Sequence, residues 1–255
     1  MAAGEAIILG SGTSNGVPML GVHYSPEFLA NPKNHRMRSS CLLKGPEGNF
    51  LIDCTPEMRL QLVRAEIYSV HEVLITHTHA DHVMGMDDLR SFCMIEKRAI
   101  PIYTLPRYQA DIRRIFPYAF AEMPTGVFVP RFDLRDAPDT LESCGLTIQI
   151  FEVQHGQVPC LGVRVNDFAY LTDVNFISDE VKSGLQGLDT LVIDAVRHEP
   201  HPNHFHFDAT MAMIAELRPK MAYLTHLSHE YDHNSFEDNL PLNVRLAYDG
   251  LAIHI

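Results

Sequence analysis

The 255-residue sequence lacks several features that would define its class at once. Its five cysteines form no C-x-x-C pair, so neither a thiolate zinc site nor a disulfide framework is predicted, and a reducing compartment fits best. The first residues have no basic segment typical of a signal peptide. No apolar run approaches the ~20 residues that cross a bilayer. We therefore expect a cytoplasmic protein with no membrane partner.

Positive charge is also scarce. Lys and Arg number 20 against 32 Asp and Glu, and the formal net charge is −12. Since nucleic-acid binding depends on clustered Lys and Arg, this balance argues against a large nucleic acid as partner. No repeat, low-complexity tract or Gly/Ser-rich linker divides the chain, so residues 1–255 are expected to form a single domain.

Short apolar runs of strand length recur, with helical patterns between some of them. The expected strands are residues 6–9, 50–52, 73–76, 148–153, 168–172, 190–193 and 221–225. The expected helices are residues 55–65, 108–118, 179–185 and 208–217, with a further helix that begins near His82. Strands mixed with helices indicate a layered α/β fold.

Histidine is abundant, with 15 residues, and four apolar runs end on a side chain of a metal-binding type. The runs LITH, YLTD, YLTH and IQIFEVQH end at His77, Asp173, His226 and His155. In layered α/β folds, binding groups gather just past the C-terminal ends of strands. The pattern therefore predicts one shared site.

The densest cluster of such residues is LITHTHADHVMG, residues 74–85. Alternate side chains of an extended segment lie on the same face, so His77 and His79 can bind one ion. Asp81 and His82 follow at the turn into the expected helix and are directed at a second position close to the first. Imidazole and carboxylate together suit zinc, iron or manganese rather than calcium.

The THTHADH motif resembles the signature of the metallo-β-lactamase superfamily of binuclear metal hydrolases, and the later ligands follow in the expected order. The resemblance extends from LGSGTSNG through LTDV and LTHLSH to AYDGL, nearly the whole chain. It implies an α/β fold, a four-layer αββα sandwich. It also implies two divalent transition metal ions, zinc or manganese, with iron also compatible.

The resemblance further implies which residues bind each ion. The first metal would take His77, His79 and His155, and the second would take Asp81, His82 and His226, with Asp173 bridging the two. Asp53, in LIDCTP, lies too early in the sequence to be a ligand. It either orients a ligand histidine or caps a helix.

Two other motifs are not expected to carry chemistry of their own. The HEYDH stretch, residues 229–233, satisfies the H-E-x-x-H pattern of zinc proteases. That chemistry needs both histidines on one face of a helix, and NSFEDNLP, which follows, is a poor helix former. The glycine-rich residues 10–16 lack the spacing of a dinucleotide loop, and Val17-Pro18 follows where a helix should start.

Within the superfamily, three segments resemble the branch that contains the phosphodiesterase for phosphoribosyl cyclic phosphate: HEPHPNHFHFD, RMRSS and MDDLRSF. The resemblance makes His204 the candidate general acid, unless it is only a histidine near a helix N-terminus, and adds Asp81 to the catalytic residues. The expected substrate-binding residues are Arg36, Arg38, Arg90, His206 and His229, although each arginine is equally explained by an ordinary ion pair. The C-x-C-x-x-C cluster that holds a structural zinc in that branch has no counterpart in GVHYSPEF.

The implied function is a phosphodiesterase that acts on a small cyclic phosphate or nucleotide-like phosphodiester through a metal-bridging hydroxide. Three alternatives remain: an RNase Z-like nuclease, a thioesterase or lactonase, and a non-hydrolytic binding protein similar to pyrroloquinoline quinone biosynthesis protein B. The lysine-rich arm expected of the nuclease is not visible in the sequence. The physiological substrate and the oligomeric state, a homodimer included, are left open.

Overall fold

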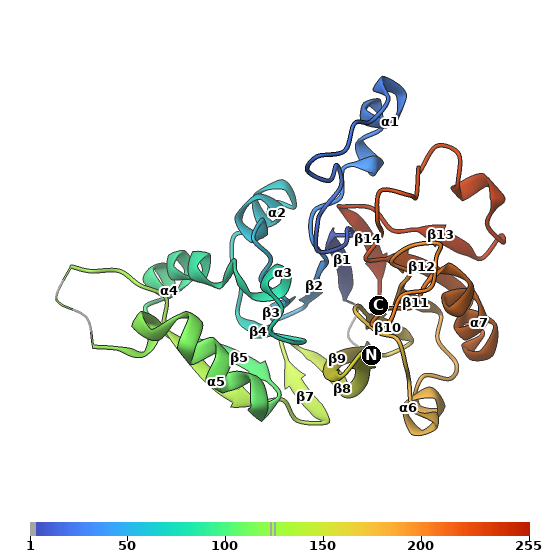
Figure 1. The fold of residues 1–255 in the computed structure, drawn as a ribbon. Helices are drawn as coiled ribbons and strands as arrows, with labels where there is room; N and C mark the ends of the chain where they lie inside the picture. The colour runs from blue at the N-terminus through green and yellow to red at the C-terminus, as the bar shows by residue number, and fades with distance from the viewer. Residues whose placement is uncertain (1–3, 123, 125) are drawn as a thin grey trace.

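Two seven-stranded β-sheets form the centre of the computed structural model, which describes residues 4–122, 124 and 126–255 (Figure 1). The first sheet has the order β14-β1-β2-β3-β4-β5-β6 and the second has the order β13-β12-β11-β10-β9-β8-β7. Each sheet is antiparallel on one side and parallel on the other, with β3 to β6 and β10 to β13 as the parallel parts.

The strands of the first sheet are β1 (Glu5–Gly10), β2 (Ser40–Gly45), β3 (Gly48–Ile52), β4 (Glu72–Leu74), β5 (Ile100–Thr104), β6 (Phe132–Asp136) and β14 (Leu251–His254). Those of the second are β7 (Thr140–Ser143), β8 (Leu146–His155), β9 (Val158–Val165), β10 (Phe168–Leu171), β11 (Thr190–Asp194), β12 (Met221–Thr225) and β13 (Val244–Leu246). The α-helices are α1 (Pro26–Ala30), α2 (Met58–Arg64), α3 (Ala80–Val83), α4 (Arg90–Glu96), α5 (Pro106–Ile115), α6 (Asp179–Gly184) and α7 (Phe207–Leu217). Short 3₁₀ helices are η1 (Pro32–Asn34), η2 (Met86–Leu89), η3 (Pro117–Phe120) and η4 (Glu237–Asn239).

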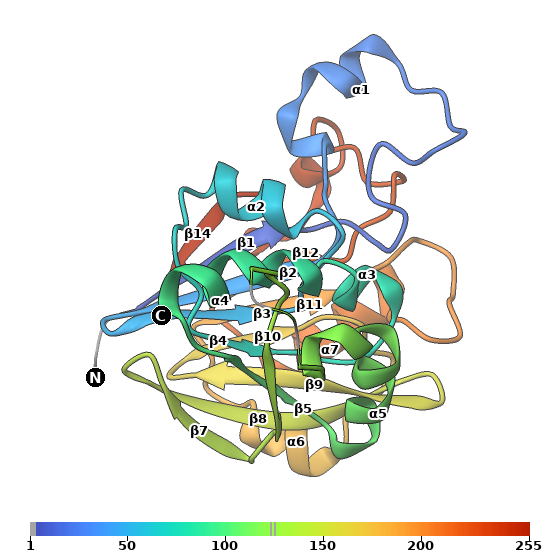
Figure 2. The same cartoon turned by 90° about the vertical axis from the view of Figure 1, so that its left-hand side faces the viewer.

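The apolar side chains divide the molecule into four layers. Between the sheets, residues such as Phe50 pack in one buried cluster with Val163 and Tyr170. A second cluster joins the first sheet to α2, α4 and α5, and a third joins the other sheet to α6 and α7. Helices therefore cover both outer faces, as Figures 1 and 2 show, and the expected αββα sandwich is confirmed.

Three helices differ from the prediction, and the one expected over residues 108–118 is α5, which ends at Ile115 before η3. The helix expected over residues 55–65 begins only at Met58, because the Thr55 hydroxyl accepts from the Glu57 N–H and donates to Gln61 in a turn before it. The helix expected to begin near His82 is divided into α3, η2 and α4. The N–H of Gly85 donates to the carbonyl of Cys54 at 2.9 Å instead of continuing α3.

The segment that lacks the cysteine cluster projects from the sandwich with α1 (Figure 2). Ser25 caps α1, and the Tyr24 ring stacks on Phe28 with a centroid distance of 4.8 Å. Asn34 donates to Asp232 at 2.8 Å. Aromatic packing and polar side-chain contacts thus hold this segment. Within the described residues, no helix combines the length and apolar character that a membrane crossing requires.

Candidate metal centre

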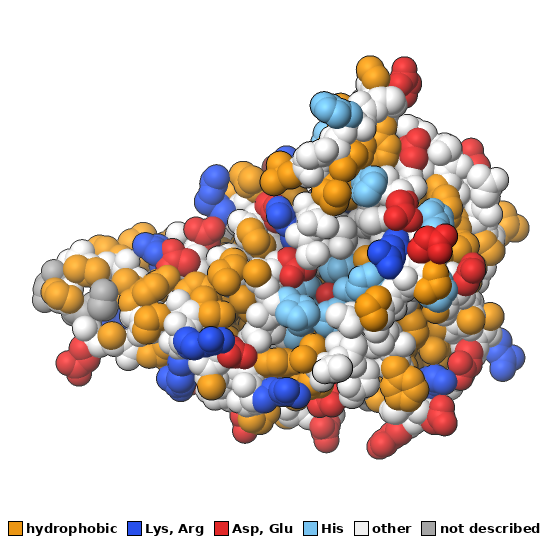
Figure 3. All heavy atoms as spheres, in the orientation of Figure 1, with side chains coloured by type: hydrophobic (Ala, Val, Ile, Leu, Met, Phe, Trp, Pro, Cys, Tyr) orange, Lys and Arg blue, Asp and Glu red, His pale blue; other side chains and the backbone are white. Residues whose placement is uncertain are grey.

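The ends of four strands from both sheets bring the expected ligands together. In the structure, all seven of these residues and His204 fall into four overlapping groups, and within each group the ligand atoms lie within 4.8 Å of one another. β4 leads into the histidine-rich turn, β8 ends at His155, and β10 and β12 end just before Asp173 and His226. In Figure 3 the histidines gather in a hollow near the middle of the visible face.

The first group consists of three imidazoles. His77 Nε2 lies 2.8 Å from His79 Nδ1, and His155 Nε2 lies 3.3 Å from the same atom. His77 and His155 are buried, whereas His79 is exposed. Three imidazole nitrogens with an open side are the ligand set of a catalytic zinc site, in which the remaining position is left for water or substrate.

The carboxylate of Asp173 lies between two sets of histidines, His77 and His155 on one side and His82 and His226 on the other. Its Oδ2 is 3.8 Å from both His77 Nε2 and His155 Nε2, and its Oδ1 is 3.3 Å from His82 Nε2 and His226 Nδ1. Asp81 Oδ2 lies 3.2 Å from His82 Nε2. Each of these two sets of histidines therefore faces a different oxygen of Asp173. A carboxylate that bridges two metal ions has this arrangement.

Asp53 fixes the orientation of His82. Its Oδ2 lies 2.7 Å from His82 Nδ1, and its two oxygens accept from the N–H and the hydroxyl of Thr76, each at 2.8 Å. The other ring nitrogen, His82 Nε2, is buried and has no hydrogen-bond partner among the described residues. A buried polar atom without a partner is costly, and a ring nitrogen in this position fits a metal ion.

The charges around these residues also fit a cation. Burial lowers the pKa of His77 well below its usual range and that of His155 to about 4, which keeps both rings in the neutral form that binds metals. At His82, burial acts in the same direction, but Asp173, Asp81 and Asp53 together outweigh it and raise the pKa. These carboxylates favour positive charge at the centre of the cluster.

Three residues of the site adopt left-handed backbone conformations within two positions of the end of a strand. The φ angles are 65° for Asp53, 50° for Asp173 and 57° for His226. For residues other than glycine this conformation costs roughly 1–3 kcal/mol and persists only where the surrounding contacts hold it. Strain of this kind is concentrated at functional sites, and here it occurs at three strand ends around one cluster.

His204 faces the same cluster and is held by a residue that the sequence pattern did not indicate. Its Nδ1 lies 2.7 Å from Asp194 Oδ2, and its Nε2 lies 4.0 Å from Asp173 Oδ2. Burial lowers the pKa of His204, but the carboxylate of Asp194 outweighs this and raises it to about 9. The ring stacks on His226 at a centroid distance of 4.7 Å.

A cavity of about 360 Å³ opens over the cluster. His229 lines it, as do residues 13–16 of the glycine-rich loop. His206 does not; it stands at the N-terminus of α7. The stretch that contains the H-E-x-x-H pattern forms turns rather than a helix.

The three arginines expected at the substrate do not line this cavity. Arg36 is 1% exposed, and its guanidinium donates to the carbonyl of Tyr231 at 2.7 Å, so it supports the loop after β12. Arg38 pairs with Glu57, and Arg90 pairs with Asp87. All three arginines therefore have structural contacts away from the cavity.

Several residues that line the cavity were not predicted from the sequence. They are Asn15, Met19, Arg197, His201, Asn203 and Glu230. Three of them lie within four positions of His204 or His226, so proximity to a candidate residue in the chain was the available signal. Asp194 gave another signal, because LVID ends on an acidic residue just as YLTD does.

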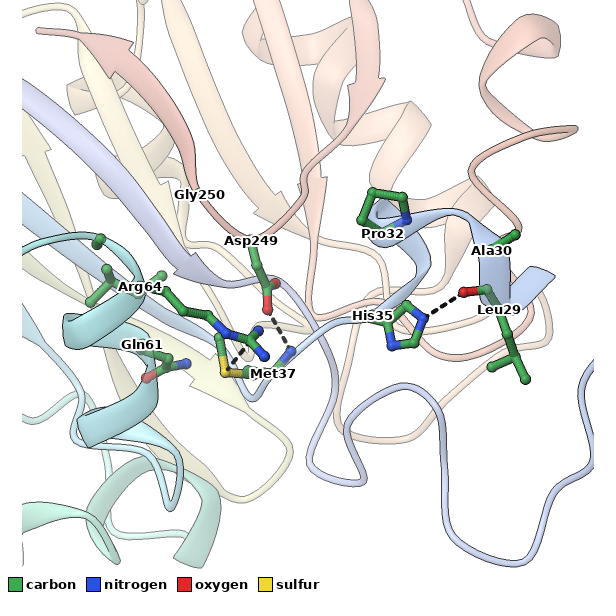
Figure 4. A pocket seen from close by; sticks show the side chains of 11 residues that line it. Leu29, Ala30, Pro32, His35, Met37, Gln61, Arg64, Asp249 and Gly250 are labelled. Atoms are coloured by element: carbon green, nitrogen blue, oxygen red, sulfur yellow. Dashed lines mark hydrogen bonds between the residues drawn. The ribbon is translucent and has the colours of Figure 1, made fainter. Parts of the chain in front are cut away.

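A second cavity, of about 480 Å³, is lined by residues of α1, α2 and the turn before β14 (Figure 4). Asp249 forms part of its wall and accepts from the N–H of Met37 at 2.7 Å and from the N–H of Ser11 at 2.9 Å. Within the described residues, none of the metal-binding groups includes a residue of this wall. The contacts of Asp249 tie the glycine-rich loop to the turn before β14, which is a structural role.

The comparisons with known proteins agree with this geometry. A family profile described as "Beta-lactamase superfamily domain" matches residues 48–227. The chain belongs to this superfamily, as its ligand motif and fold indicate. An octanoyltransferase of Porphyromonas gingivalis is 34% identical over 252 residues, which are 97% of this chain but 51% of that protein. The chain thus spans about half the length of this relative.

Among solved structures, one described as a new diphosphatase from the PhnP family is 32% identical, with a TM-score of 0.90. The similarity covers 99% of this chain and 97% of that one. The Zn²⁺-bound PqqB from Methylobacterium extorquens is 20% identical with a TM-score of 0.79, over 98% and 99% of the two chains. The second likeness concerns the fold alone, whereas the first extends to the sequence.

Proposed function

We propose that the chain is a binuclear metal-dependent phosphodiesterase that acts on a small phosphodiester. The observation that carries this proposal is the placement of His204, which Asp194 holds by a 2.7 Å contact with Nε2 directed toward Asp173. The metal ligands alone would serve several hydrolytic reactions, but an alkoxide is a poor leaving group and benefits from an acid at this position. Similarity to a PhnP-family diphosphatase supports the choice.

The residues present would hold two ions. His77, His79 and His155 would bind the first, Asp81, His82 and His226 would bind the second, and Asp173 would contact both. Divalent ions at such a site lower the pKa of water and polarise a phosphoryl oxygen. Zinc and manganese both suit imidazole and carboxylate ligands, and iron is also compatible.

The protein side chains supply the proton transfers. As water oxygen attacks phosphorus and the P–O bond to the alcohol breaks, His204 Nε2 gives its proton to the departing oxygen. Asp194 keeps the ring oriented through Nδ1 and stabilises its charged form. Asp81, 9% exposed at the cavity wall, would accept a hydrogen bond from the attacking water. Proton donation of this kind contributes ~10²–10⁴-fold to the rate.

The cavity argues for a small substrate over the alternatives. Its volume of about 360 Å³ suits a sugar phosphate or a dinucleotide fragment rather than a folded RNA. A thioester releases a thiolate, which needs no acid, so His204 and Asp194 would have no purpose in a thioesterase. The name octanoyltransferase belongs to a protein about twice as long, of which this chain covers 51%, so the name alone does not favour acyl transfer by this chain.

A panel of substrates tests the proposal. Purified protein loaded with Mn²⁺ or Zn²⁺ should hydrolyse bis(p-nitrophenyl) phosphate and a cyclic nucleotide, but not an acyl thioester. Thioester turnover without phosphodiester cleavage would refute it. Turnover of none of these compounds by metal-loaded protein would favour a binding role.

The role of His204 can be separated from general damage to the site. His204→Ala should reduce cleavage of a cyclic nucleotide, whose leaving group is an alkoxide, by ~10²–10⁴-fold. Cleavage of bis(p-nitrophenyl) phosphate, whose leaving group is a stable phenolate, should fall by less than about tenfold. His254→Ala, which replaces an exposed histidine on β14, is the matched control. Equal losses for both substrates would contradict the acid role.

A further inference from the structure

Asn175 lies where two loops of the metal centre meet. It stands two positions after Asp173, and its N–H donates to the carbonyl of Gln154 at 2.8 Å. The N–H of Gln154 donates in turn to the carbonyl of Phe176 at 3.0 Å. These bonds belong to a short antiparallel bridge that joins the loop after β10 to the end of β8. The backbone at Asn175 is therefore fixed beside His155.

The side-chain amide of Asn175 connects this bridge to the loop before α7. Its Oδ1 accepts from the N–H of Gly156 at 2.8 Å, and its Nδ2 donates to the carbonyl of Pro202 at 2.8 Å. These two bonds fix the orientation of the amide, because the opposite orientation would place oxygen against a carbonyl and NH₂ against an N–H. Asn175 is not among the described residues that line the cavity over the cluster, so it acts on the site through its neighbours.

The loop that Asn175 holds contacts both a candidate metal ligand and the candidate acid. The carbonyl of Asn203 accepts from His155 Nδ1 at 2.8 Å. Because a carbonyl only accepts, the ring proton of His155 lies on Nδ1, and Nε2 is left for a metal ion. Asn203 stands between Pro202, which Asn175 holds, and His204. Pro202 and Asn203 are both exposed, so hydrogen bonds rather than burial fix their position.

We propose that Asn175 is a positioning residue, which holds residues 202–204 so that His155 keeps the ring orientation of a metal ligand and His204 keeps its place beside the cluster. The first effect concerns the metal centre alone. The second rests on the proposed phosphodiesterase function, in which His204 donates a proton. Residues that orient a ligand commonly change metal affinity and activity, and a displacement of about 1 Å at a reacting group costs up to ~10²-fold in rate.

Metal affinity tests the first effect. Asn175→Ala removes both side-chain bonds and should weaken the binding of one of the two ions ~10-fold, because His155 belongs to one ligand group only. Competition with a chromophoric chelator for Zn²⁺ resolves the two dissociation constants. Asn243→Ala, which replaces an exposed asparagine before β13, is the matched control. Wild-type affinity for both ions in Asn175→Ala, or equal weakening of both, would overturn the inference.

A second variant distinguishes the two bonds of the amide. In Asn175→Asp, the carboxylate still accepts from the N–H of Gly156 but cannot donate to the carbonyl of Pro202. The affinity for one ion should therefore fall as in Asn175→Ala, although the turn after β8 keeps its contact. If Asn175→Asp instead binds both ions as the wild type does, the bond to Pro202 has no effect on the site and the inference is wrong.

Turnover distinguishes a failure of this inference from a failure of the proposed function. With metal at saturation, Asn175→Ala should lower kcat for a cyclic nucleotide ~10- to 100-fold. For bis(p-nitrophenyl) phosphate, whose leaving group needs no acid, kcat should fall by less than about threefold. KM should be unchanged for both.

The possible outcomes are separate for the two proposals. If the wild type cleaves neither compound while the loss of affinity for one ion is observed, the phosphodiesterase proposal fails and the role of Asn175 toward His155 stands. If the wild type cleaves both, and Asn175→Ala changes neither metal affinity nor the ratio of the two rates, the proposed function stands and the inference is wrong.

Discussion

Asp53 shows how much of the site depends on residues that do not touch a metal. Both of its oxygens are engaged, one by the Thr76 N–H and the other by the Thr76 hydroxyl and His82 Nδ1. It is fully buried, and burial raises its pKa, against the opposite effect of His82. A buried carboxylate is tolerated only when it is bonded in this way. Its contacts leave Nε2 of His82 directed into the cluster.

Replacing Asp53 should therefore weaken metal binding without removing a ligand. In Asp53→Asn, the amide cannot accept all three hydrogen bonds, and the imidazole of His82 loses its fixed tautomer. We expect the affinity for the second metal to fall ~10–100-fold, as for other residues that orient ligands. Titration with Zn²⁺ against a chromophoric chelator measures this. Asp139→Asn, at an exposed position, is the control; equal affinities in the two variants would contradict the role.

Among individual residues, the sequence predicted the candidate metal ligands better than the residues that hold the site's histidines in place. His77, His79, Asp81 and His82 stand within six positions after an apolar run, and such a dense group of ligand-type side chains is typical of a metal site. Asp194 gave only a weaker signal, an acidic residue at the end of an apolar run, because its contact with His204 is made only after folding. For the three arginines the sequence left substrate binding and an ordinary ion pair equally open, and in the structure their side chains lie outside the lining of the cavity.

Among the elements, the turn that joins α3 to η2 connects the metal ligands to the rest of the first sheet. The N–H of Gly85 donates to Cys54 O at 2.9 Å, and Cys54 N–H donates in turn to His82 O at 2.8 Å. A Cβ on Gly85 would lie 1.9 Å from the carbonyl oxygen of Thr55, which is backbone and cannot move away. The backbone of the loop after β3 and the backbone of the turn that carries the ligands are therefore so close at Gly85 that no side chain fits between them.

A methyl group at this position should displace the turn. Gly85→Ala is expected to lower the free energy of unfolding by ~1–3 kcal/mol, the usual cost of overpacking, and to weaken metal binding. Gly184→Ala places the same methyl group in α6, where no atom lies within 4 Å of it, and should be neutral or stabilising by about 0.5–1 kcal/mol. Chemical denaturation of both variants measures the difference. Similar stabilities would show that the turn is not tightly packed.

The strands and helices show which elements the pattern of apolar residues can predict and which it cannot. All seven expected strands are present, because each is a short apolar run bounded by turn residues. β9 was missed because VPCLGVRV contains a proline and a glycine, which normally argue against a strand interior. The division of the helix after His82 could not be seen, since it depends on a hydrogen bond between Gly85 and Cys54, which is far away in the sequence.

For the whole molecule, the cluster joins the two halves of the sandwich. The first sheet leads to His77, His79, Asp81 and His82, and the second supplies His155, Asp173 and His226. The site between the two sheets exists only in the folded protein, so the free energy of metal binding adds to the free energy of unfolding. The sequence predicted this arrangement only through its resemblance to the metallo-β-lactamase superfamily. The number of residues between two ligands along the chain does not give the distance between them in the folded protein.

Metal removal should consequently lower thermal stability. With free metal at about a hundred times its dissociation constant, the gain is roughly 2.7 kcal/mol, or roughly 5–10 °C in Tm for a chain of this size. Calorimetry of metal-loaded and chelator-treated protein measures it. Asp173→Asn should reduce the difference strongly, because this residue faces both groups. A Tm that does not depend on metal would contradict the arrangement.

Anomalous diffraction from crystals of metal-loaded protein, recorded at the absorption edge of the bound element, locates the bound ions. We expect two peaks about 3.5–4 Å apart, one beside His77, His79 and His155 and the other beside Asp81, His82 and His226. The two oxygens of Asp173 should each be bonded to one of them. A single peak, or an Asp173 side chain turned away from both ions, would contradict this expectation.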